Sequence, residues 1–358
     1  MTPVVRQLAE LRAGDTELFG GKSASLGELI AAGINVPPGF ALSTEAFTLF
    51  LSVDRLGERI ADALSGVDPA DVGSVQRASE EIAEAMRATD VPESVRAEVS
   101  RAYGALGEQA GVDEAAVAVR SSARGEDSAD ATFAGQQDSY LWVAGVDDVC
   151  DAIRECWTSL YSPPAITYRA QIAAGAGAPA MGVTVQLMVD AEVSGVMFTC
   201  SPATGDPSIV SVNSSWGLGL AVVGGEVTPD EFAISKVTGE ILRQTIGDKA
   251  VEYVHAPGER GARTAPTPDE RRNIASLDAE RLAGLLAAAK AIERHFGSRQ
   301  DIEWALARSG TFPSNLYMLQ SRPVTATPTA GSDAVQDRKG AGAMALVLGT
   351  FGVKPAGG

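Results

Sequence analysis

The 358-residue sequence is poor in cysteine and histidine: it has three and two of them, and its cysteines (Cys150, Cys156, Cys200) form no CxxC pair. Structural zinc sites need closely spaced cysteine and histidine ligands, so the sequence predicts none. An odd number of cysteines without a secretion signal predicts reduced thiols that are buried as small hydrophobic side chains.

Long hydrophobic runs and an excess of positive charge are also missing. No stretch reaches the roughly 20 apolar residues that span a bilayer, and residues 1–15 contain no apolar signal-peptide core. Lys plus Arg number 29 against 46 for Asp plus Glu, a formal net charge of −17. Such a chain has no broad positive field for nucleic acid or anionic lipid. We therefore expect a cytoplasmic protein that binds neither.

What is present is ordinary globular composition, with 45% hydrophobic and 21% charged residues, and enough length for about two domains. Periodicity and turn signals predict a mixture of helices and strands. Helices are expected over residues 22–32, 71–110, 147–175 (interrupted by Pro163-Pro164) and 268–297. Strands are expected around residues 115–122, 139–143, 183–199 (a hairpin), 208–235, 301–306 and 315–322, and a tail or linker after about residue 326.

The first candidate site is Gly20-Gly21-Lys22-Ser23 at the start of a predicted helix. Two glycines let backbone N–H groups approach a phosphate, and Lys22 supplies positive charge. The stretch is not a Walker A loop, because that pattern requires a glycine where Thr16 stands. Taken alone, the stretch is a weak signal, and it is more typical of a plain turn with a solvated lysine.

The second candidate is Arg120, which ends a predicted strand before a polar loop that contains Gly135 and Gln136. A guanidinium in that place can bind a polyphosphate through two hydrogen bonds. An exposed arginine beside a surface loop is the alternative.

The third candidate is a pair of strands, DIEW and LQSR, in which Asp301 and Glu303, and likewise Gln320 and Arg322, stand two residues apart. Side chains two apart share one face of a strand, so a hairpin would bring all four together. Carboxylate and amide oxygens suit Mg²⁺, and Arg322 could offset charge on a moving phosphoryl group. The alternative is an exposed hairpin face with a cross-strand Asp–Arg pair.

The fourth candidate is the apolar segment around Gln186, Met188 and Val189, a buried edge whose backbone could contact an adenine. An ordinary core strand explains the same pattern. His255 and His295 belong to no recognisable catalytic group, and capping of a helix C-terminus is the role we expect for His295.

These segments occur in a fixed order together with several others. In sequence they read GGKSASLGELIAAGINVPPGFALS, VRSSARGED with FAGQQDSYLWV, AIRECWTSLYSPPAITYR, VQLMVDAEVSGVMFTCSPATGD, SSWGLGLAVVGGEVTPD, DIEWA and LQSRPVT. Together they resemble the N-terminal nucleotide-binding domain of the pyruvate phosphate dikinase, phosphoenolpyruvate synthase and rifampin phosphotransferase family, over about residues 15–325.

The resemblance implies an α+β protein with the ATP-grasp fold, in which two subdomains with mixed or antiparallel sheets and flanking helices close on ATP. We expect one subdomain in residues 1–188, the second, with the catalytic hairpin, in residues 189–326, and a flexible tail or linker in residues 327–358.

The resemblance also assigns roles. Lys22 and Arg120 match the lysine and arginine that contact phosphate in the family. Glu303 and Gln320 match the family's metal-binding pair. Asp301 and Arg322 match their neighbours in the catalytic strands. The expected ligands are ATP and Mg²⁺, or Mn²⁺ in its place. The full set expected to bind the nucleotide is Lys22, Arg120, Gly135, Gln136, Gln186, Met188, Val189, Glu303, Gln320 and Arg322, with Arg322, Asp301, Arg120 and Lys22 as the catalytic group.

The sequence departs from the family in three places. Leu220 replaces the glutamate of the family's GLGE motif, and the loop between the two catalytic strands looks longer than usual, so that it could shape the pocket for the acceptor. The sequence also has no Thr-Ser-His motif of the kind that carries the phosphoryl group in the family enzymes.

We therefore expect an ATP-dependent phosphotransferase, a kinase of class EC 2.7, whose acceptor is supplied in trans. A small molecule or peptide is the first expectation, with transfer to nitrogen in a biosynthetic pathway. The alternatives are a nucleotide-binding subunit of a split synthase or dikinase, which phosphorylates a carrier histidine on a separate protein, and a nucleotide-binding domain without turnover.

Overall fold

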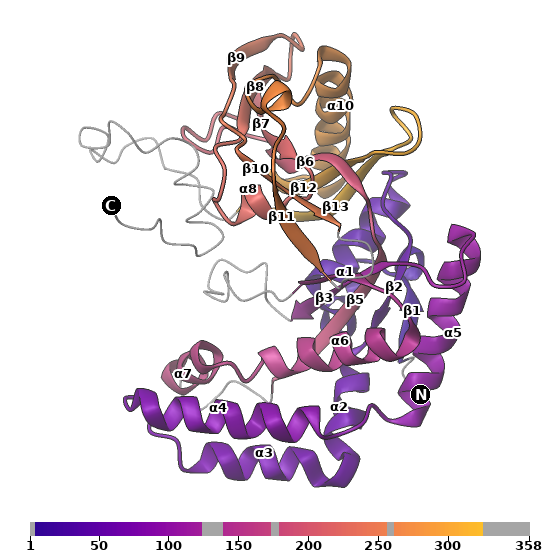
Figure 1. Ribbon diagram of the computed structural model, residues 1–358, viewed down its shortest axis with the longest axis vertical. Coiled ribbons are helices and arrows are strands. Elements are labelled where there is room, and N and C mark those ends of the chain that lie inside the picture. Colours follow the sequence, from indigo (N-terminus) through magenta and orange to yellow (C-terminus); the bar gives the residue numbers. More distant parts are fainter. Residues whose placement is uncertain (1–3, 124–138, 173–178, 256–260, 325–358) are drawn as a thin grey trace. The chain divides into compact units, whose positions relative to one another are not determined.

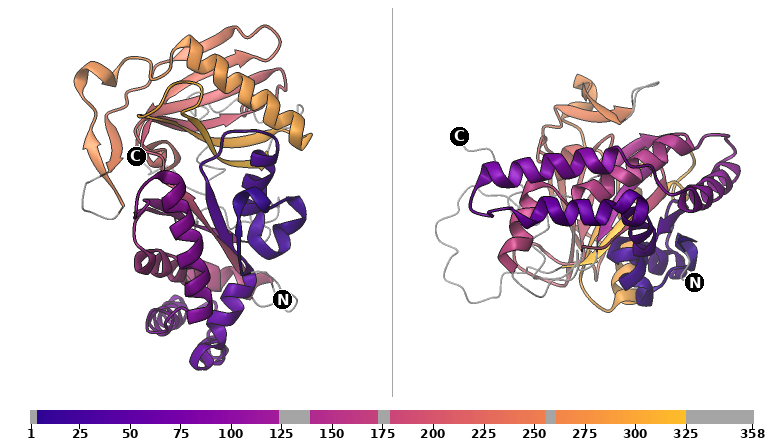
Figure 2. Two further views of the ribbon diagram at one scale, coloured as in Figure 1. Left: turned by 90° about the vertical axis from the view of Figure 1, so that its right-hand side faces the viewer. Right: turned by 90° about the horizontal axis from the view of Figure 1, so that it is seen from below.

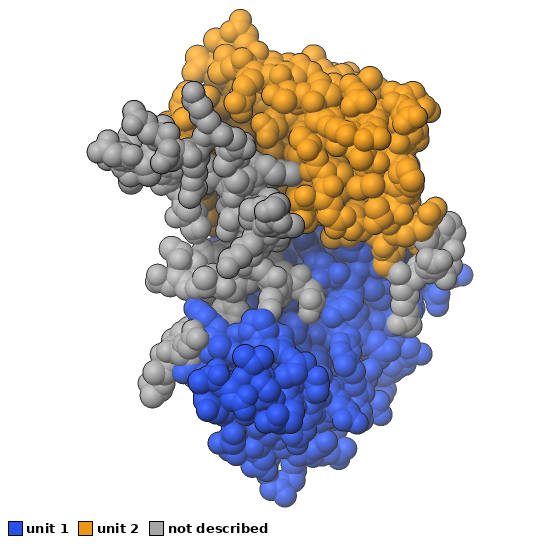
Figure 3. Space-filling view, turned by 60° about the vertical axis from the view of Figure 1, so that its left-hand side comes forward, with its two compact units in different colours: residues 1–27, 38–126, 136–188 blue, residues 28–37, 127–135, 189–358 orange. Residues whose placement is uncertain are grey.

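The computed structural model describes residues 4–123, 139–172, 179–255 and 261–324. The chain divides into two compact units (Figure 3), here called unit 1 (residues 1–27, 38–126 and 136–188) and unit 2 (residues 28–37, 127–135 and 189–358). Each unit combines helices with an antiparallel sheet, so the predicted α+β class is confirmed. None of the helices in these described ranges is both long and apolar enough to cross a membrane.

Unit 1 is built on a five-stranded sheet in the order β1-β2-β5-β3-β4, with antiparallel neighbours throughout (Figure 1). Its strands are β1 Val5–Gln7, β2 Gly39–Leu42, β3 Val117–Ala123, β4 Ser139–Val143 and β5 Met181–Leu187. Its helices are α2 Thr44–Ser52, α3 Leu56–Ser65, α4 Val72–Arg87, α5 Glu93–Ala110, α6 Val146–Ser159 and α7 Pro163–Ile172, and α1 Thr16–Ala31 begins in unit 1.

The core of unit 1 lies between one face of this sheet and the helices. Val119 and Val185 face each other across β3 and β5, and both belong to a buried cluster with aromatic rings from α2 and α6. There Phe50 stacks on Trp157 with ring centroids 5.0 Å apart. The other face of the same strands therefore carries their polar side chains.

Unit 2 is built on a six-stranded antiparallel sheet in the order β13-β12-β6-β7-β8-β9. Its strands are β6 Ala191–Phe198, β7 Ile209–Trp216, β8 Asp230–Ser235, β9 Ile241–Thr245, β12 Gln300–Ala307 and β13 Leu316–Pro323, and β10 Val251–His255 pairs with β11 Ala262–Pro266 in a separate hairpin. Its helices are α8 Leu220–Val223, α9 Asp269–Arg272 and α10 Ala279–Phe296.

The two faces of this sheet are covered differently. Helix α10 packs along one face (Figure 2), where Ser214 and Trp216 of β7 contact the segment that leads into the helix. On the other face, Val196 and Phe198 of β6 pack against α8 and its neighbours. Asp301 and Glu303 lie on that second face, because each is directly opposite one of these two β6 residues.

Two helix predictions need correction. The long helix expected over residues 268–297 is two helices, α9 and α10, because Ser276 hydrogen-bonds with buried side chains and Asp278 caps α10 by accepting from Arg281 N–H. Pro163 does not interrupt a helix but begins α7, in the first turn where proline is tolerated.

All three cysteines are free and buried, as the sequence predicts. Burial raises the pKa of the Cys150 thiol to about 11, and it also raises the pKa of Cys200. A thiol with a raised pKa is protonated at neutral pH and is a poor nucleophile. These cysteines therefore act as packing residues.

Candidate functional site

The Gly20-Gly21-Lys22-Ser23 turn in α1 is seated on the end of β3. Gly20 has φ +79° and interrupts the helix, and an added Cβ there would lie 2.0 Å from the carbonyl oxygen of Ser122. Ser23 N–H donates to Ser122 Oγ at 3.2 Å, and its hydroxyl shares a 2.7 Å hydrogen bond with Thr184 of β5. Only glycine tolerates both this backbone conformation and this approach.

Lys22 is held at the same place by the neighbouring strand residue. Its ammonium group donates to the carbonyl oxygen of Ser121 at 2.8 Å, and the side chain is only 2% exposed. The plain turn with a solvated lysine is therefore wrong. A buried lysine fixed beside a glycine turn is a suitable point charge for a phosphate group.

Arg120 and Gln186 lie on the same face of the unit 1 sheet as this turn. In the antiparallel register Arg120 is opposite Thr184, and Ala118 is opposite Gln186. Directly opposed residues share a face, so the polar side chains of β3 and β5 lie on the side away from the valine core. Unit 1 thus brings together three residues that the sequence predicts for nucleotide binding, Lys22, Arg120 and Gln186.

If the turn binds a nucleotide phosphate as the sequence predicts, replacing Gly20 by alanine should weaken ATP binding by about tenfold or more, because the turn cannot keep its place against Ser122 and Lys22 would lose its position for a charge-assisted contact. Calorimetric titration with Mg-ATP measures the change. The matched control is Gly33→Ala, since Gly33 has a similar φ of +73° but no atom within 4 Å of an added Cβ. Equal ATP affinity in Gly20→Ala and wild type would contradict this role of the turn.

The segment proposed for the adenine differs from its prediction. Strand β5, which contains Gln186, is the central strand of its sheet and not an edge. The N–H groups of Leu187 and Met188 already donate to the carbonyl oxygens of Pro38 and Ala116. Neither N–H is therefore available to a base, and an adenine contact here would depend on the Met188 carbonyl or on Val189. Gly135 and Gln136 lie outside the described residues.

In unit 2 the predicted catalytic hairpin is confirmed as a pair of strands. β12 and β13 are antiparallel, with Asp301 opposite Arg322 and Glu303 opposite Gln320. All four side chains therefore lie on one face, as the two-residue spacing predicts. A bulge follows immediately, between Glu303 and Trp304, and bulges often lie beside active sites, where they redirect side chains.

Asp301 and Arg322 form a buried ion pair, which contradicts the alternative of an exposed hairpin face. Arg322 Nε donates to Asp301 Oδ2 at 3.0 Å, and the two side chains are 12% and 3% exposed respectively. Burial makes this carboxylate a firm support for the guanidinium. Arg322 is therefore held in one orientation beside Gln320.

Glu303 and Gln320 fit the oxygen-rich coordination of Mg²⁺. The Oε1 atom of Gln320 is buried and has no hydrogen-bond partner among the described residues, directly across from the Glu303 carboxylate. A buried amide oxygen without a partner calls for a ligand or water. In the described ranges, no group of three or more Asp, Glu, His or Cys side chains is placed so that it could hold a metal ion. Mg²⁺ held by few protein ligands keeps waters and substrate phosphates as the others.

The polar face of unit 2 extends to a residue that the sequence analysis did not single out. Val196 of β6 is opposite both Glu303 and Asn213, so Gln320, Glu303, Val196 and Asn213 form one row across four strands. Asn213 is fully buried, and neither atom of its amide has a partner in the described part of the chain. Only the strand register could have revealed it, since its sequence neighbours are ordinary strand residues.

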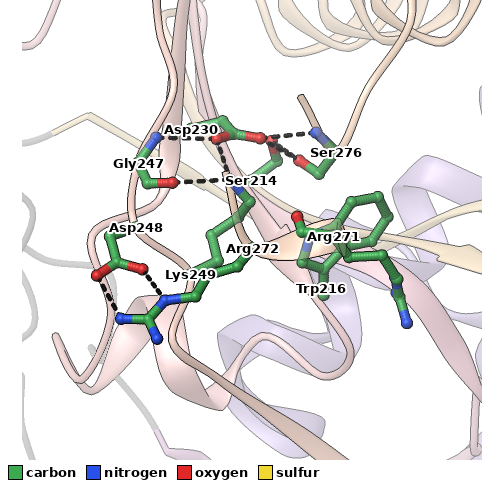
Figure 4. A network of polar contacts seen from close by, with 9 residues as sticks. All are labelled: Ser214, Trp216, Asp230, Gly247, Asp248, Lys249, Arg271, Arg272 and Ser276. Carbon is green, nitrogen blue, oxygen red and sulfur yellow. Dashed lines mark hydrogen bonds and ion pairs between the residues drawn. The ribbon is translucent and has the colours of Figure 1, made fainter. Parts of the chain in front are cut away.

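A second unpredicted feature is a buried polar network (Figure 4), here called the Asp230 network. Asp230 and Lys249 are both fully buried, with Oδ1 and Nζ 2.5 Å apart, and Gly247 N–H also donates to Asp230. The other carboxylate oxygen accepts from the backbone and the hydroxyl of Ser276, which also hydrogen-bonds Ser214. This network joins the start of β8 to the segments before β10 and α10.

Three further predictions can now be compared with the structure. His295 does not cap its helix: its ring nitrogen lies 2.8 Å from the Glu28 carboxylate, while Gly297 ends α10. In the loop after β12, Phe312 lies against Gly284 of α10, and its part in an acceptor pocket stays a prediction. Leu220 begins α8 and is 38% exposed.

The comparisons with known proteins agree with one family. Residues 16–342 match the family described as "Pyruvate phosphate dikinase, AMP/ATP-binding domain". The chain is 40% identical to a probable phosphoenolpyruvate synthase of Methanothermobacter thermautotrophicus over 91% of this chain and 46% of that protein. It is also 40% identical to the phosphoenolpyruvate synthase of Neisseria meningitidis, over 88% of this chain and 41% of that protein.

These relatives are longer proteins, and the chain spans less than half of each. Among solved structures, D-alanyl-alanine synthetase A from Vibrio cholerae matches 71% of this chain and 56% of that chain, with 12% identity and a TM-score of 0.25. A likeness as weak as this carries no argument.

Proposed function

Because the chain belongs to the pyruvate phosphate dikinase AMP/ATP-binding domain family, we propose that it transfers a phosphoryl group from Mg-ATP to a nucleophilic acceptor. The observation that carries the proposal is the buried hairpin face of unit 2, where an Asp301–Arg322 ion pair adjoins the Glu303–Gln320 pair. The ATP-grasp arrangement expected from the sequence is part of this proposal.

Each residue has a role that follows from its surroundings. Lys22 and Arg120 bind nucleotide phosphates from the polar face of unit 1, where Lys22 is fixed by Ser121. Arg322, oriented by Asp301, offsets the negative charge on the phosphoryl group as it moves. Glu303 and Gln320 would hold Mg²⁺, which supplies further charge neutralisation on the phosphates when bound.

The reaction breaks a P–O bond of ATP and forms a new P–N or P–O bond to the acceptor, whose proton passes to solvent or to a base. Catalysis of this kind depends mainly on positioning and electrostatics, because none of the residues assigned here to ATP or Mg²⁺ forms a covalent bond with the phosphoryl group. A rigid ion pair and a lysine fixed by a backbone carbonyl are features of a site that is organised before its substrate binds.

For the acceptor, the relatives are named phosphoenolpyruvate synthases, and the family resemblance implies a carrier histidine, on another segment or a separate protein. Direct transfer to a small molecule or peptide is the second candidate. The chain's own His295 is a poor acceptor in either case, because it is paired with Glu28.

Product analysis with labelled ATP separates these acceptors. The chain is incubated with Mg-ATP and, in turn, with no acceptor, with small nitrogen nucleophiles, and with the full-length Neisseria meningitidis relative whose own nucleotide site has been inactivated by substitution. We expect acid-labile label on the relative and a nucleotide product that depends on it. Label on a small molecule would favour the second candidate. ATP binding without any transfer in every mixture would reject the proposed activity and leave a binding domain.

A further inference from the structure

Helix α7 of unit 1 carries a positive charge that no nearby acidic residue balances. Arg169 is the one charged residue in residues 156–189, although 21% of the whole sequence is charged. Its Nη2 atom is buried and has no hydrogen-bond partner among the described residues. The guanidinium lies over the ring of Tyr161, with 5.1 Å between its central carbon and the ring centroid. A buried donor without an acceptor requires an explanation, and the more so when it belongs to a charged group.

Other arginines of the same helical layer are balanced by carboxylates. Three of them form ion pairs with acidic residues of α6, namely Arg87 with Glu155, Arg96 with Asp147 and Arg154 with Asp151. A hydrogen bond to its carboxylate raises the pKa of Arg87, and the same holds for Arg96. Burial lowers the pKa of Arg169, and in the part of the chain that the structure describes only Tyr161 opposes this shift. Because an arginine remains protonated in proteins even so, Arg169 is a partly buried cation without an acidic neighbour.

The surroundings of this cation separate it from the proposed nucleotide-binding face. Tyr161 is 4% exposed and belongs to the buried cluster of unit 1 that also contains Val119 and Val185. That cluster lies on the helix side of the sheet, and Arg120 lies on the opposite, polar face. Helix α7 packs on α4 within the helical layer (Figure 1). A nucleotide bound on the polar face therefore does not supply the missing partner.

We propose that Arg169 and Tyr161 form an oxyanion site in the helical layer of unit 1, which binds the phosphate or carboxylate group of a small anion. A guanidinium presents its N–H donors in one plane, so two of them can bind two oxygens of such a group. The aromatic ring supports the guanidinium from one side. Burial raises the pKa of the Tyr161 hydroxyl, so the ring adds no negative charge that would repel the anion.

A packing role would explain the stem of Arg169 but not its charge. The aliphatic stem could cover the same apolar surface if it ended in an apolar group. A buried charge without a partner lowers the free energy of unfolding, and a bound oxyanion offsets this loss. The chain has 46 acidic residues, so carboxylates are plentiful. Their absence around this one guanidinium keeps its donors available to a ligand.

Thermal unfolding of the full chain tests the proposal with two probes, sodium phosphate and sodium acetate, and with sodium chloride of equal ionic strength as the reference. The unfolding temperature of the wild type should rise with the concentration of an oxyanion and approach a plateau. Arg169→Met should weaken the apparent affinity about tenfold or more, since it removes the charge-assisted hydrogen bonds. The control is Arg101→Met, which removes the same charge from an exposed position of α5 and should leave the response unchanged.

A non-hydrolysable Mg-ATP analogue at saturating concentration separates this site from the proposed nucleotide site. The response that depends on Arg169 should persist in its presence, because the two sites lie on opposite sides of the sheet. Loss of the response with the analogue would place the oxyanion in the nucleotide site and overturn the proposal. Since Arg169→Met and Arg101→Met are compared with and without the analogue, the result stands even if the chain proves not to bind ATP.

The order of stability provides a second test. In sodium chloride, Arg169→Met should unfold at or above the temperature of the wild type, because it removes an uncompensated charge and keeps an apolar stem. In saturating oxyanion the order should reverse. A larger shift with phosphate than with acetate would assign the site to phosphate groups, and the opposite result would assign it to carboxylates. An equal response of wild type and Arg169→Met to both probes would overturn the proposal and leave Arg169 as a packing residue.

Discussion

Replacing Asp230 by alanine should lower the free energy of unfolding by about 3–5 kcal/mol, as removal of one partner of a buried ion pair does in other proteins. The change leaves the Lys249 ammonium fully buried without its carboxylate. It also removes the acceptor of the Gly247 and Ser276 N–H groups. The Lys249 charge would keep only the Gly247 carbonyl oxygen as a hydrogen-bond partner among the described residues, and two buried backbone donors would lose their acceptor inside unit 2.

Urea denaturation followed by tryptophan fluorescence measures this loss. The control is a double variant, Asp230→Asn with Lys249→Met, which removes both charges, keeps an acceptor oxygen at position 230 and replaces the lysine stem with a side chain of similar length. It should recover only part of the stability: it removes the unpaired buried charge, but the single amide oxygen can replace only one of the two carboxylate oxygens that accept from Gly247 and Ser276. A loss below about 1 kcal/mol in Asp230→Ala would show that the Asp230 network is not what holds these segments together.

Much of the fold could be predicted because its signals are local. The two-residue spacing in DIEW and LQSR is enough to place Asp301, Glu303, Gln320 and Arg322 on one face once the strands pair. The glycines and Ser23 likewise mark a turn before a helix. Predictions failed where a distant partner decided the outcome. The helix expected over residues 268–297 breaks because Ser276 bonds to Asp230, 46 residues earlier in the chain.

The candidate site shows the same division. Lys22 and Arg120 were found from their own segments, but the fixing of Lys22 by Ser121 depends on the contact between α1 and β3. The segment around Gln186 and Met188 was expected to be a sheet edge, but β5 lies between β2 and β3, and the Met188 N–H donates to Ala116, just before β3. Asn213 was missed because its relation to Glu303 is a matter of register across Val196. Sequence periodicity predicts which side chains share one face of a strand. Which strands are neighbours in the sheet is decided by the tertiary structure.

Replacing Glu303 by alanine should reduce phosphoryl transfer more than about 100-fold and leave thermal unfolding near that of the wild type. Loss of groups that only support a metal ligand costs about 10–100-fold, so loss of a proposed ligand should cost at least as much. Glu303 is half-buried beside the bulge, so its removal leaves no large cavity in the core. Increasing Mg²⁺ should recover part of the activity, because Gln320 and the nucleotide phosphates remain as ligands.

Glu231→Ala is the matched control, since Glu231 is opposite Asn213 and continues the same row across the sheet, three strands from Glu303. It removes the same charge from the same face at a distance from Gln320, and we expect activity close to that of the wild type. The activity of the two variants is compared as the Mg²⁺ concentration is raised. This comparison distinguishes the loss of a metal ligand from a general change in the electrostatic field at this face of the sheet. If Glu303→Ala retained near-native transfer, or if both variants lost activity equally without response to Mg²⁺, the assignment of Glu303 and Gln320 to the metal would be wrong.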